Sequence, residues 1–183
     1  MALPRFRCPQ TALLVVDVQE KLLPHIHEHE RVLAQVCRLV DGAGLLRLPV
    51  LVTEQYRKGL GPTVDELASR LESPAVRCEK MAFSAAVDPV RQCLETVQAR
   101  SVVLCGIESH VCVLQTALDL MDSGLVVGVA ADAIGSRRPA DHDPALRRMV
   151  QAGAIPTTVE SLLMELVCEA GTPLFKSILP LIR

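Results

Sequence analysis

Short apolar runs alternate with longer amphipathic stretches along the whole chain. The runs are continuously apolar, which is typical of strands buried on both faces in a parallel sheet. They predict strands at residues 12–16, 50–53, 76–78, 102–105, 126–130 and 155–158. The stretches between them predict helices at Glu30–Leu46, Val64–Leu71, Pro89–Ala99, Val111–Asp122, Asp143–Ala152 and Ser161–Ala170.

This alternation of strand and helix predicts an α/β fold, a three-layer α/β/α sandwich with right-handed crossovers. The length of 183 residues fits one domain over residues 1–183, and no repeat or linker divides the chain. The least regular segment, Gln55–Thr63, is rich in Gly and Pro and is predicted as a loop. Ligands of such sheets bind beyond the carboxyl ends of the strands, so polar residues that follow strands are the candidates for chemistry.

Composition and charge narrow the class of partner. Nineteen Lys and Arg stand against 21 Asp and Glu, and the chain holds three Phe, one Tyr and no Trp. It therefore offers neither a basic field for phosphates nor a platform for stacked bases, and we expect no nucleic-acid partner. No apolar run approaches the length that spans a bilayer, so we expect no membrane association. The seven cysteines form no C-x-x-C pair, which suits a reducing compartment and predicts a cytoplasmic protein.

Four predicted strands are followed by polar or reactive residues: Asp17, Glu54, Lys80 and, in the segment GIESHVC, Cys112. Each has an ordinary explanation alone, as a helix cap, a loop carboxylate, a solvated lysine or an inert buried thiol. Together they supply a base, a cation and a nucleophile at one edge of the sheet. Cys112 also begins a predicted helix, where free N–H groups favour a thiolate and hold an oxyanion. We therefore predict that Cys112 is the centre of the chemistry, with a thiol pKa lowered further by Lys80 and with Asp17 moving the proton.

Three motifs follow one another along the chain: ALLVVDVQ, then Lys80, then GIESHVCV. In this order, they resemble the motifs of the isochorismatase-like cysteine hydrolases. The resemblance runs from Ala12 to the last helix. It implies a Rossmann-like fold with a mainly six-stranded parallel sheet and a catalytic triad of Asp17, Lys80 and Cys112. It also implies a non-proline cis peptide between Ile107 and Glu108, and an oxyanion hole made by the backbone N–H groups of Glu108 and Cys112.

Two departures from the family pattern narrow the function. Nicotinamidases of this family hold a metal through an Asp-x-His motif after the second strand, and the equivalent stretch here, TEQYRKGLGPT, contains no His. The histidines His25, His27 and His29 alternate in a Glu-rich loop and are interpreted as solvated, so we expect no metal and no cofactor. Isochorismatases that cleave a vinyl ether generally lack the cysteine. The chain most resembles the small isochorismatase-domain proteins that share TEQY…GLGPT, for which the resemblance supplies no substrate.

The leading hypothesis is a metal-independent hydrolase that cleaves a C–N bond of a small amide or related carbonyl compound through a thioester. Gln19, Tyr56, Phe83 and His110 are predicted to line the pocket, because they stand close to the motif positions. The alternative is a non-hydrolytic oligomeric scaffold or a redox-sensing thiol, for which Cys105 or Cys78 would have to approach Cys112 in space.

The chain's last residues bear on oligomerisation. The tail Pro173–Arg183 is more apolar than a solvated terminus requires. It either packs on its own domain or on a neighbouring copy. We favour the neighbour, and with it a homo-oligomer.

Overall fold

The computed structural model describes residues 3–71 and 76–182. These residues form one six-stranded parallel sheet of order β3-β2-β1-β4-β5-β6, which confirms the predicted α/β class. The strands are β1 (Thr11–Val16), β2 (Val50–Gln55), β3 (Val76–Lys80), β4 (Ser101–Ile107), β5 (Val126–Gly135) and β6 (Ile155–Thr157).

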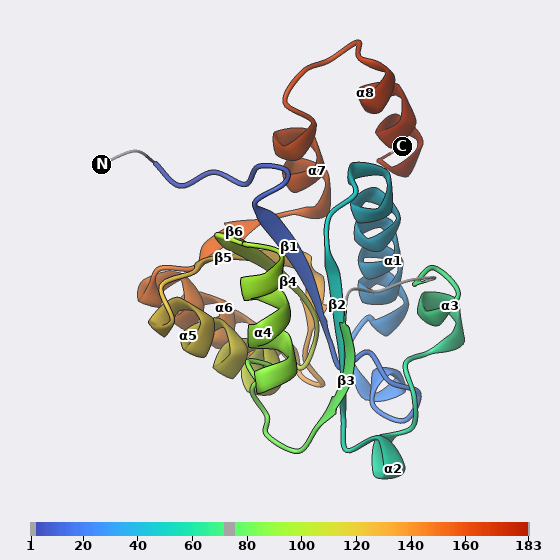
Figure 1. The fold of residues 1–183 in the computed structure, drawn as a ribbon. Coiled ribbons are helices and arrows are strands. Elements are labelled where there is room, and N and C mark those ends of the chain that lie inside the picture. Colours follow the sequence, from blue (N-terminus) through green and yellow to red (C-terminus); the bar gives the residue numbers. More distant parts are fainter. Residues whose placement is uncertain (1–2, 72–75, 183) are drawn as a thin grey trace.

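Helices cover both faces of the sheet and complete the three-layer sandwich (Figure 1). One face carries α1 and α7 with the C-terminal α8, and the other carries α4, α5 and α6. The helices are α1 (His29–Leu46), α2 (Arg57–Leu60), α3 (Asp65–Ala68), α4 (Asp88–Thr96), α5 (Leu114–Asp122), α6 (Pro139–Ala152), α7 (Val159–Val167) and α8 (Pro173–Ile178).

The core is aliphatic and lies in two clusters, one on each face of the sheet. Successive side chains of a strand point to opposite faces, so Leu13 and Val15 of β1 pack towards α1, and Leu14 and Val16 pack towards α4 and α5. All six residues of β1 are buried. Continuous burial is the physical reason for the unbroken apolar runs of the sequence.

Four strands extend beyond their predicted carboxyl ends, β2, β3 and β4 by two residues each and β5 by five. Strands β1 and β4 also begin one residue earlier than predicted, and β6 ends one residue earlier. In the parallel pairing of β2 and β3, Gln55 lies opposite Lys80, so both belong to the sheet rather than to loops. The segment predicted as a loop, Gln55–Thr63, also contains the short helix α2. The helix predicted to begin at Val111 is instead preceded by a π-helical turn, Ser109–Val113, before α5 begins.

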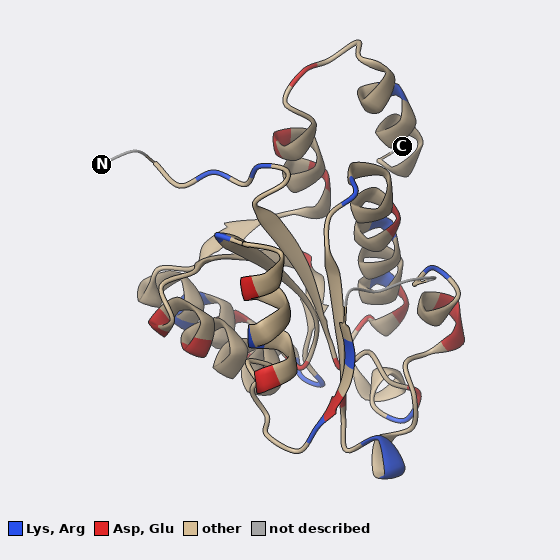
Figure 2. Cartoon of the chain, viewed as in Figure 1, with Lys and Arg blue, Asp and Glu red and all other residues tan. Residues whose placement is uncertain are grey.

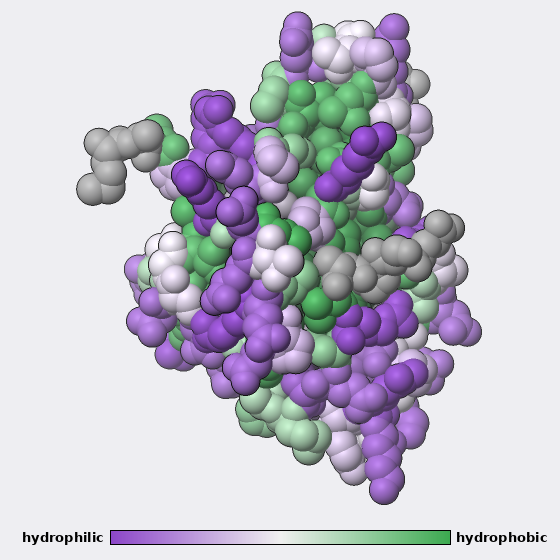
Figure 3. All heavy atoms as spheres, viewed as in Figure 1, coloured by the Kyte–Doolittle hydropathy of each residue, from purple (hydrophilic) through white to green (hydrophobic). Residues whose placement is uncertain are grey.

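The C-terminal tail packs on its own chain, the first of the two arrangements expected for it. Ile178 of α8 is fully buried, and Phe175 packs against the same cluster as α1 and α7. In the view of Figure 3, hydrophobic side chains also reach the surface between α7, α8 and α1.

Charged side chains are dispersed over helices and loops, with both signs interspersed in the view of Figure 2. Within residues 3–71 and 76–182, no helix combines the length and hydropathy that a membrane span requires.

Candidate active site

Asp17, Lys80 and Cys112 come from three elements and meet at the carboxyl edge of the sheet. Asp17 directly follows β1, Lys80 is the last residue of β3, and Cys112 lies in the π-helical turn after β4. Their exposed fractions are only 0%, 4% and 5%. Two ionisable groups and a thiol are therefore shielded from water together, which strengthens every electrostatic interaction among them.

Asp17 and Lys80 form a buried ion pair. Lys80 Nζ donates to Asp17 Oδ2 at 2.6 Å, and the hydroxyl of Thr53 donates to Asp17 Oδ1 at 2.8 Å. Burial raises the pKa of the Asp17 carboxyl, while the Lys80 ammonium and these hydrogen bonds oppose the rise. A carboxylate with a raised pKa is a better proton acceptor than an exposed one.

The Lys80 ammonium sits among oxygen acceptors besides Asp17. Nζ donates to the side-chain oxygen of Gln55 at 2.7 Å and to the backbone carbonyls of Ala82 and Phe83 at 3.2 and 3.0 Å. Gln55 in turn donates to the carbonyl of Met81 at 3.0 Å. These contacts hold the cation in place, which a long and flexible lysine needs if it is to act at one fixed position.

The pKa of the Cys112 thiol is shifted in the opposite direction from the sequence-based prediction. Burial, and then the negative charge of Asp17, raise the pKa of Cys112 to about 12, against the opposing effects of Lys80 and the backbone of Glu108. The prediction was wrong because the loss of water around the sulfur outweighs the nearby cation. The thiol is therefore neutral near pH 7, and it lies within the field of the negative charge of Asp17.

The carboxyl end of β4 passes very close to β1. A Cβ at Gly106, where φ is 111°, would lie 2.1 Å from the carbonyl oxygen of Val16, so this position requires glycine. The next peptide but one, Ile107–Glu108, is cis. The Glu108 carbonyl accepts from the N–H groups of Val111 and Val113, each at 3.1 Å.

The Glu108 side chain anchors this segment to the loop after β5. Its carboxylate accepts from Arg137 Nε at 2.9 Å and is mostly buried. The carboxylate is therefore occupied by this ion pair, and it is the backbone of Glu108 that faces the sulfur of Cys112.

The residues predicted to line the substrate pocket have different environments. Gln19 is fully buried, and its amide donates to the carbonyls of Gln55 and Gly61 and accepts from the N–H of Gln55. It is a structural residue with no amide hydrogen left for a substrate, so this prediction was wrong. Tyr56 and Phe83 are 46% and 55% exposed, in segments that hydrogen-bond to Lys80.

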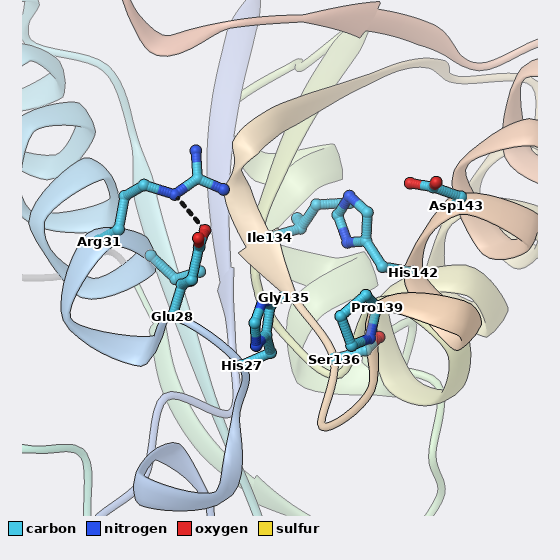
Figure 4. Close-up of a pocket in the computed structure, with 10 residues that line it drawn as sticks. His27, Glu28, Arg31, Ile134, Gly135, Ser136, Pro139, His142 and Asp143 are labelled. Carbon is cyan, nitrogen blue, oxygen red and sulfur yellow. Dashed lines mark hydrogen bonds and ion pairs between the residues drawn. The ribbon is translucent and has the colours of Figure 1, made fainter.

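The fourth predicted pocket residue, His110, is half-buried and connects the cysteine turn to a neighbouring cavity. Its Nδ1 lies 2.9 Å from the Ser136 hydroxyl, and Nδ1 of His142 lies 3.1 Å from the Ser109 hydroxyl. Ser136 and His142 line a cavity of about 260 Å³ that also includes His27 and Arg31 (Figure 4). Burial lowers the pKa of His142, so its imidazole is neutral near pH 7.

Three polar residues near the site, Thr53, Gln55 and Thr116, were not among the candidates named from the sequence, whereas Glu54 was. Thr53 and Gln55 belong to β2 and were assigned to strand and loop. The pairing of β2 with β3 places Gln55 opposite Lys80, and its pairing with β1 places Thr53 opposite Val16, the residue before Asp17. Glu54, considered as a loop carboxylate, is buried and accepts from the N–H and hydroxyl of Thr63, each at 2.7 Å. Thr116 carried no signal, because a threonine inside an amphipathic helix is ordinary.

Across the described ranges, no group of three or more His, Cys, Asp and Glu residues is arranged to hold a metal ion. The alternating histidines His25, His27 and His29 fall at the end of a short 3-10 turn and at the start of α1.

Fold and site together define a class of protein. It is a parallel α/β protein with a cysteine, a carboxylate and a lysine at the carboxyl edge of its sheet. Residues 11–161 match the family model of the isochorismatase domain, and the chain belongs to that family.

Two named relatives are similar to this chain over most of their own length. The "Secreted isochorismatase effector Isc1" of Phytophthora sojae is 45% identical over 177 residues, which are 94% of this chain and 84% of the relative. "Isochorismatase domain-containing protein 2" of Pongo abelii is 44% identical over 173 residues, which are 93% of this chain and 82% of the relative.

Solved structures share the whole fold. MAR1 ribonuclease from Caenorhabditis elegans superposes with a TM-score of 0.94 at 41% identity, covering 98% of this chain and 92% of that one. YcaC from Pseudomonas aeruginosa, solved with hexane-2,5-diol and covalent acrylamide, gives 0.90 at 26% identity, covering 99% and 93%. YcaC from Escherichia coli, described as an octameric hydrolase of unknown specificity, gives 0.86 at 26% identity, covering 92% and 85%.

Proposed function

We propose that the protein is a cysteine-dependent hydrolase that cleaves the C–N bond of a small amide or related carbonyl compound through a thioester. Membership of the isochorismatase family supports a hydrolase. The observation that carries the finer proposal is the buried ion pair of Asp17 and Lys80, which faces the thiol of Cys112. Buried charges of this kind destabilise a fold unless they are fully partnered, and they concentrate at functional sites.

In the proposed reaction, the Cys112 sulfur attacks the carbonyl carbon while Asp17 takes the thiol proton. The carbonyl oxygen becomes an oxyanion, which accepts hydrogen bonds from the backbone N–H groups of Glu108 and Cys112. The C–N bond then breaks, Asp17 returns the proton to the amine, and a thioester remains. Water attacks the thioester with Asp17 again as base, which releases the acid and restores the thiol.

The state of the thiol favours this scheme over the redox-sensing alternative. A sensor cysteine needs a thiolate at neutral pH, whereas burial keeps the Cys112 thiol neutral there. A neutral thiol beside a carboxylate of raised pKa is instead arranged for attack assisted by a general base. The Asp17–Lys80 pair is neutral overall, which favours an uncharged substrate over an ionised one.

Similar structures supply further support and one competing candidate. Acrylamide is an electrophilic amide, and its covalent attachment to YcaC is consistent with a reactive nucleophile in this fold. The likeness to MAR1 ribonuclease, at 41% identity, makes RNA cleavage the second candidate. Burial of the three site residues and the formal net charge of −2 favour the small amide over RNA.

The decisive experiment compares Cys112→Ala with Cys37→Ala across a panel of small amides, nitriles, esters and a structured RNA. Cys37 is buried in α1 and serves as the matched control. We expect Cys112→Ala to lose turnover and the acyl adduct seen by mass spectrometry, and Cys37→Ala to keep both. Undiminished amide hydrolysis by Cys112→Ala would contradict the proposal, and RNA cleavage without amide hydrolysis would favour the second candidate.

We further propose a homo-oligomer and a cytoplasmic location. The octameric E. coli YcaC supports the first, and the cysteine content supports the second, although the P. sojae relative is named as secreted. Light scattering on the full chain tests the oligomer, and a monomeric mass would contradict it. Fractionation of the cells that make the protein tests the location, which recovery from the medium would overturn.

A further inference from the structure

Two hydrogen bonds from different segments of the chain meet at the hydroxyl of Thr116. This residue lies in α5, one turn after Cys112, and is fully buried. Its Oγ1 donates to the carbonyl of Cys112 at 2.6 Å and accepts from the N–H of Ala85 at 2.7 Å. A helical threonine commonly bonds the carbonyl four residues earlier. The bond from Ala85, 31 residues away, is the unusual one.

Ala85 belongs to the segment that runs from the end of β3 to the start of α4 (Figure 1). The same segment wraps the Lys80 ammonium, because Nζ donates to the carbonyls of Ala82 and Phe83. Thr116 therefore ties the segment that holds Lys80 to the turn that holds Cys112. Among the hydrogen bonds of the described residues, no other joins residues 81–87 to residues 106–116.

We propose that Thr116 is a positioning residue, whose hydroxyl sets the separation between the Lys80 ammonium and the sulfur of Cys112. This inference rests on the proposed function, because the separation matters for turnover only if both groups take part. Without the hydroxyl, the buried N–H of Ala85 loses its acceptor, and the segment must move to find another. The two carbonyls that hold Lys80 move with it.

Thr116→Val tests the role with little change in shape, because valine replaces only the hydroxyl with a methyl. We expect kcat to fall about 10- to 100-fold, as misplaced catalytic groups do, with KM little changed. The acid limb of the pH profile of kcat/KM, which Asp17 sets, should move to higher pH, because Lys80 lowers the Asp17 pKa and a looser contact lowers it less. Thr116→Ser keeps the hydroxyl and should restore both the rate and the limb.

Thr11→Val is the matched control at the other edge of the sheet. Thr11 is equally buried, and its hydroxyl bonds the carbonyl of Arg7 and the hydroxyl of Ser101. We expect it to lower stability by a similar amount while kcat and the pH profile stay as in the wild type. A folded Thr116→Val with wild-type kcat and profile would overturn the inference. If Thr116→Val does not fold, Thr116→Ala against Thr116→Ser makes the same comparison.

Alkylation of Cys112 by acrylamide separates failure of this inference from failure of the proposed function. Retained activity in Cys112→Ala overturns the proposed function. Even then, the rate at which acrylamide alkylates Cys112 reports whether Thr116 affects the position of the thiol, because this measurement needs no substrate. We then expect slower labelling in Thr116→Val and wild-type labelling in Thr116→Ser and Thr11→Val. An inactive Cys112→Ala together with a Thr116→Val that matches the wild type in rate and labelling overturns only the role of Thr116.

Discussion

Strands β1 and β4 run side by side through the sheet, and their two ends bury different kinds of polar group. At the amino end, the hydroxyls of Thr11 and Ser101 share a hydrogen bond of 2.8 Å, and both residues are buried. At the carboxyl end, Asp17 and Lys80 bury opposite charges beside the thiol of Cys112.

The difference indicates that the neutral contact at the amino end serves stability, whereas the charged cluster at the carboxyl end serves function. The two hydroxyls bond one another and the neighbouring backbone of Arg7 and Gln10, so the amino end is a closed and uncharged structural contact. The ion pair needs Thr53, Gln55 and two backbone carbonyls to complete its hydrogen bonds. Apolar residues often serve stability as well as a buried ion pair does, so a charged cluster of this complexity indicates chemistry.

The largest expected effect is that of Lys80→Met. Methionine keeps the length of the side chain but leaves Asp17 buried without its cation. We expect activity to be lost and the free energy of unfolding to fall by about 3–5 kcal/mol. Chemical denaturation and a turnover assay measure the two effects. A loss of less than 1 kcal/mol, roughly that of a surface pair, would show that the pair is not buried as described.

A second effect is a pH dependence of stability that comes from Cys112. Its pKa rises from 9.0 to about 12 on folding, so the unfolded chain releases the thiol proton first as the pH increases. The contribution of the protonated Cys112 thiol to the free energy of unfolding is therefore intact below pH 9. It is lost between pH 9 and 12 and amounts to at most about 4 kcal/mol. Between pH 7 and 10.5, the free energy of unfolding should fall more steeply with pH for the wild type than for Cys112→Ala. Parallel curves would contradict the raised pKa.

Gln55→Leu should have an intermediate effect. Leucine removes the acceptor for Lys80 Nζ and the donor to the carbonyl of Met81. We expect a loss of about 1–3 kcal/mol in stability, because buried groups are left without partners, together with a lower kcat. Gln55→Glu, which restores an acceptor for Lys80, is the comparison variant. Equal stability of Gln55→Leu and the wild type would show that the contact is dispensable.

The smallest effect belongs to the amino end. Thr11→Val breaks a neutral contact and should lower the free energy of unfolding by about 1 kcal/mol, with turnover unchanged. Thermal unfolding and the amide assay measure both. A loss of turnover in this variant would mean that the two ends of the sheet are coupled.

Local patterns in the sequence predicted the layers of the fold and the positions of its chemistry. All six predicted strands are present. The four inner strands β1, β2, β4 and β5 are largely buried, which explains their apolar runs, whereas the edge strands β3 and β6 are only partly buried. Asp17, Lys80 and Cys112 were identified because reactive residues after strands fall at one edge of a parallel sheet. Their assembly into a catalytic triad stays a prediction.

The partners of these residues were beyond the reach of the sequence. Gln55 and Thr53 look like ordinary strand residues until the register of β2 against β3 and β1 brings them beside Lys80 and Asp17. Gln19, close to a motif in sequence, was predicted to meet the substrate and instead bonds the backbone. Proximity along the chain gives no information on side-chain direction, which packing decides.

The sequence by itself therefore determined the α/β order of elements and the identity of the buried carboxylate, ammonium and thiol, because hydrophobic periodicity and strand ends are local features. The tertiary structure alone decided the burial of that thiol, the direction of its pKa and the contact of Thr116 with Ala85. Burial and hydrogen bonding between segments depend on how distant parts of the chain pack, and no local pattern records them.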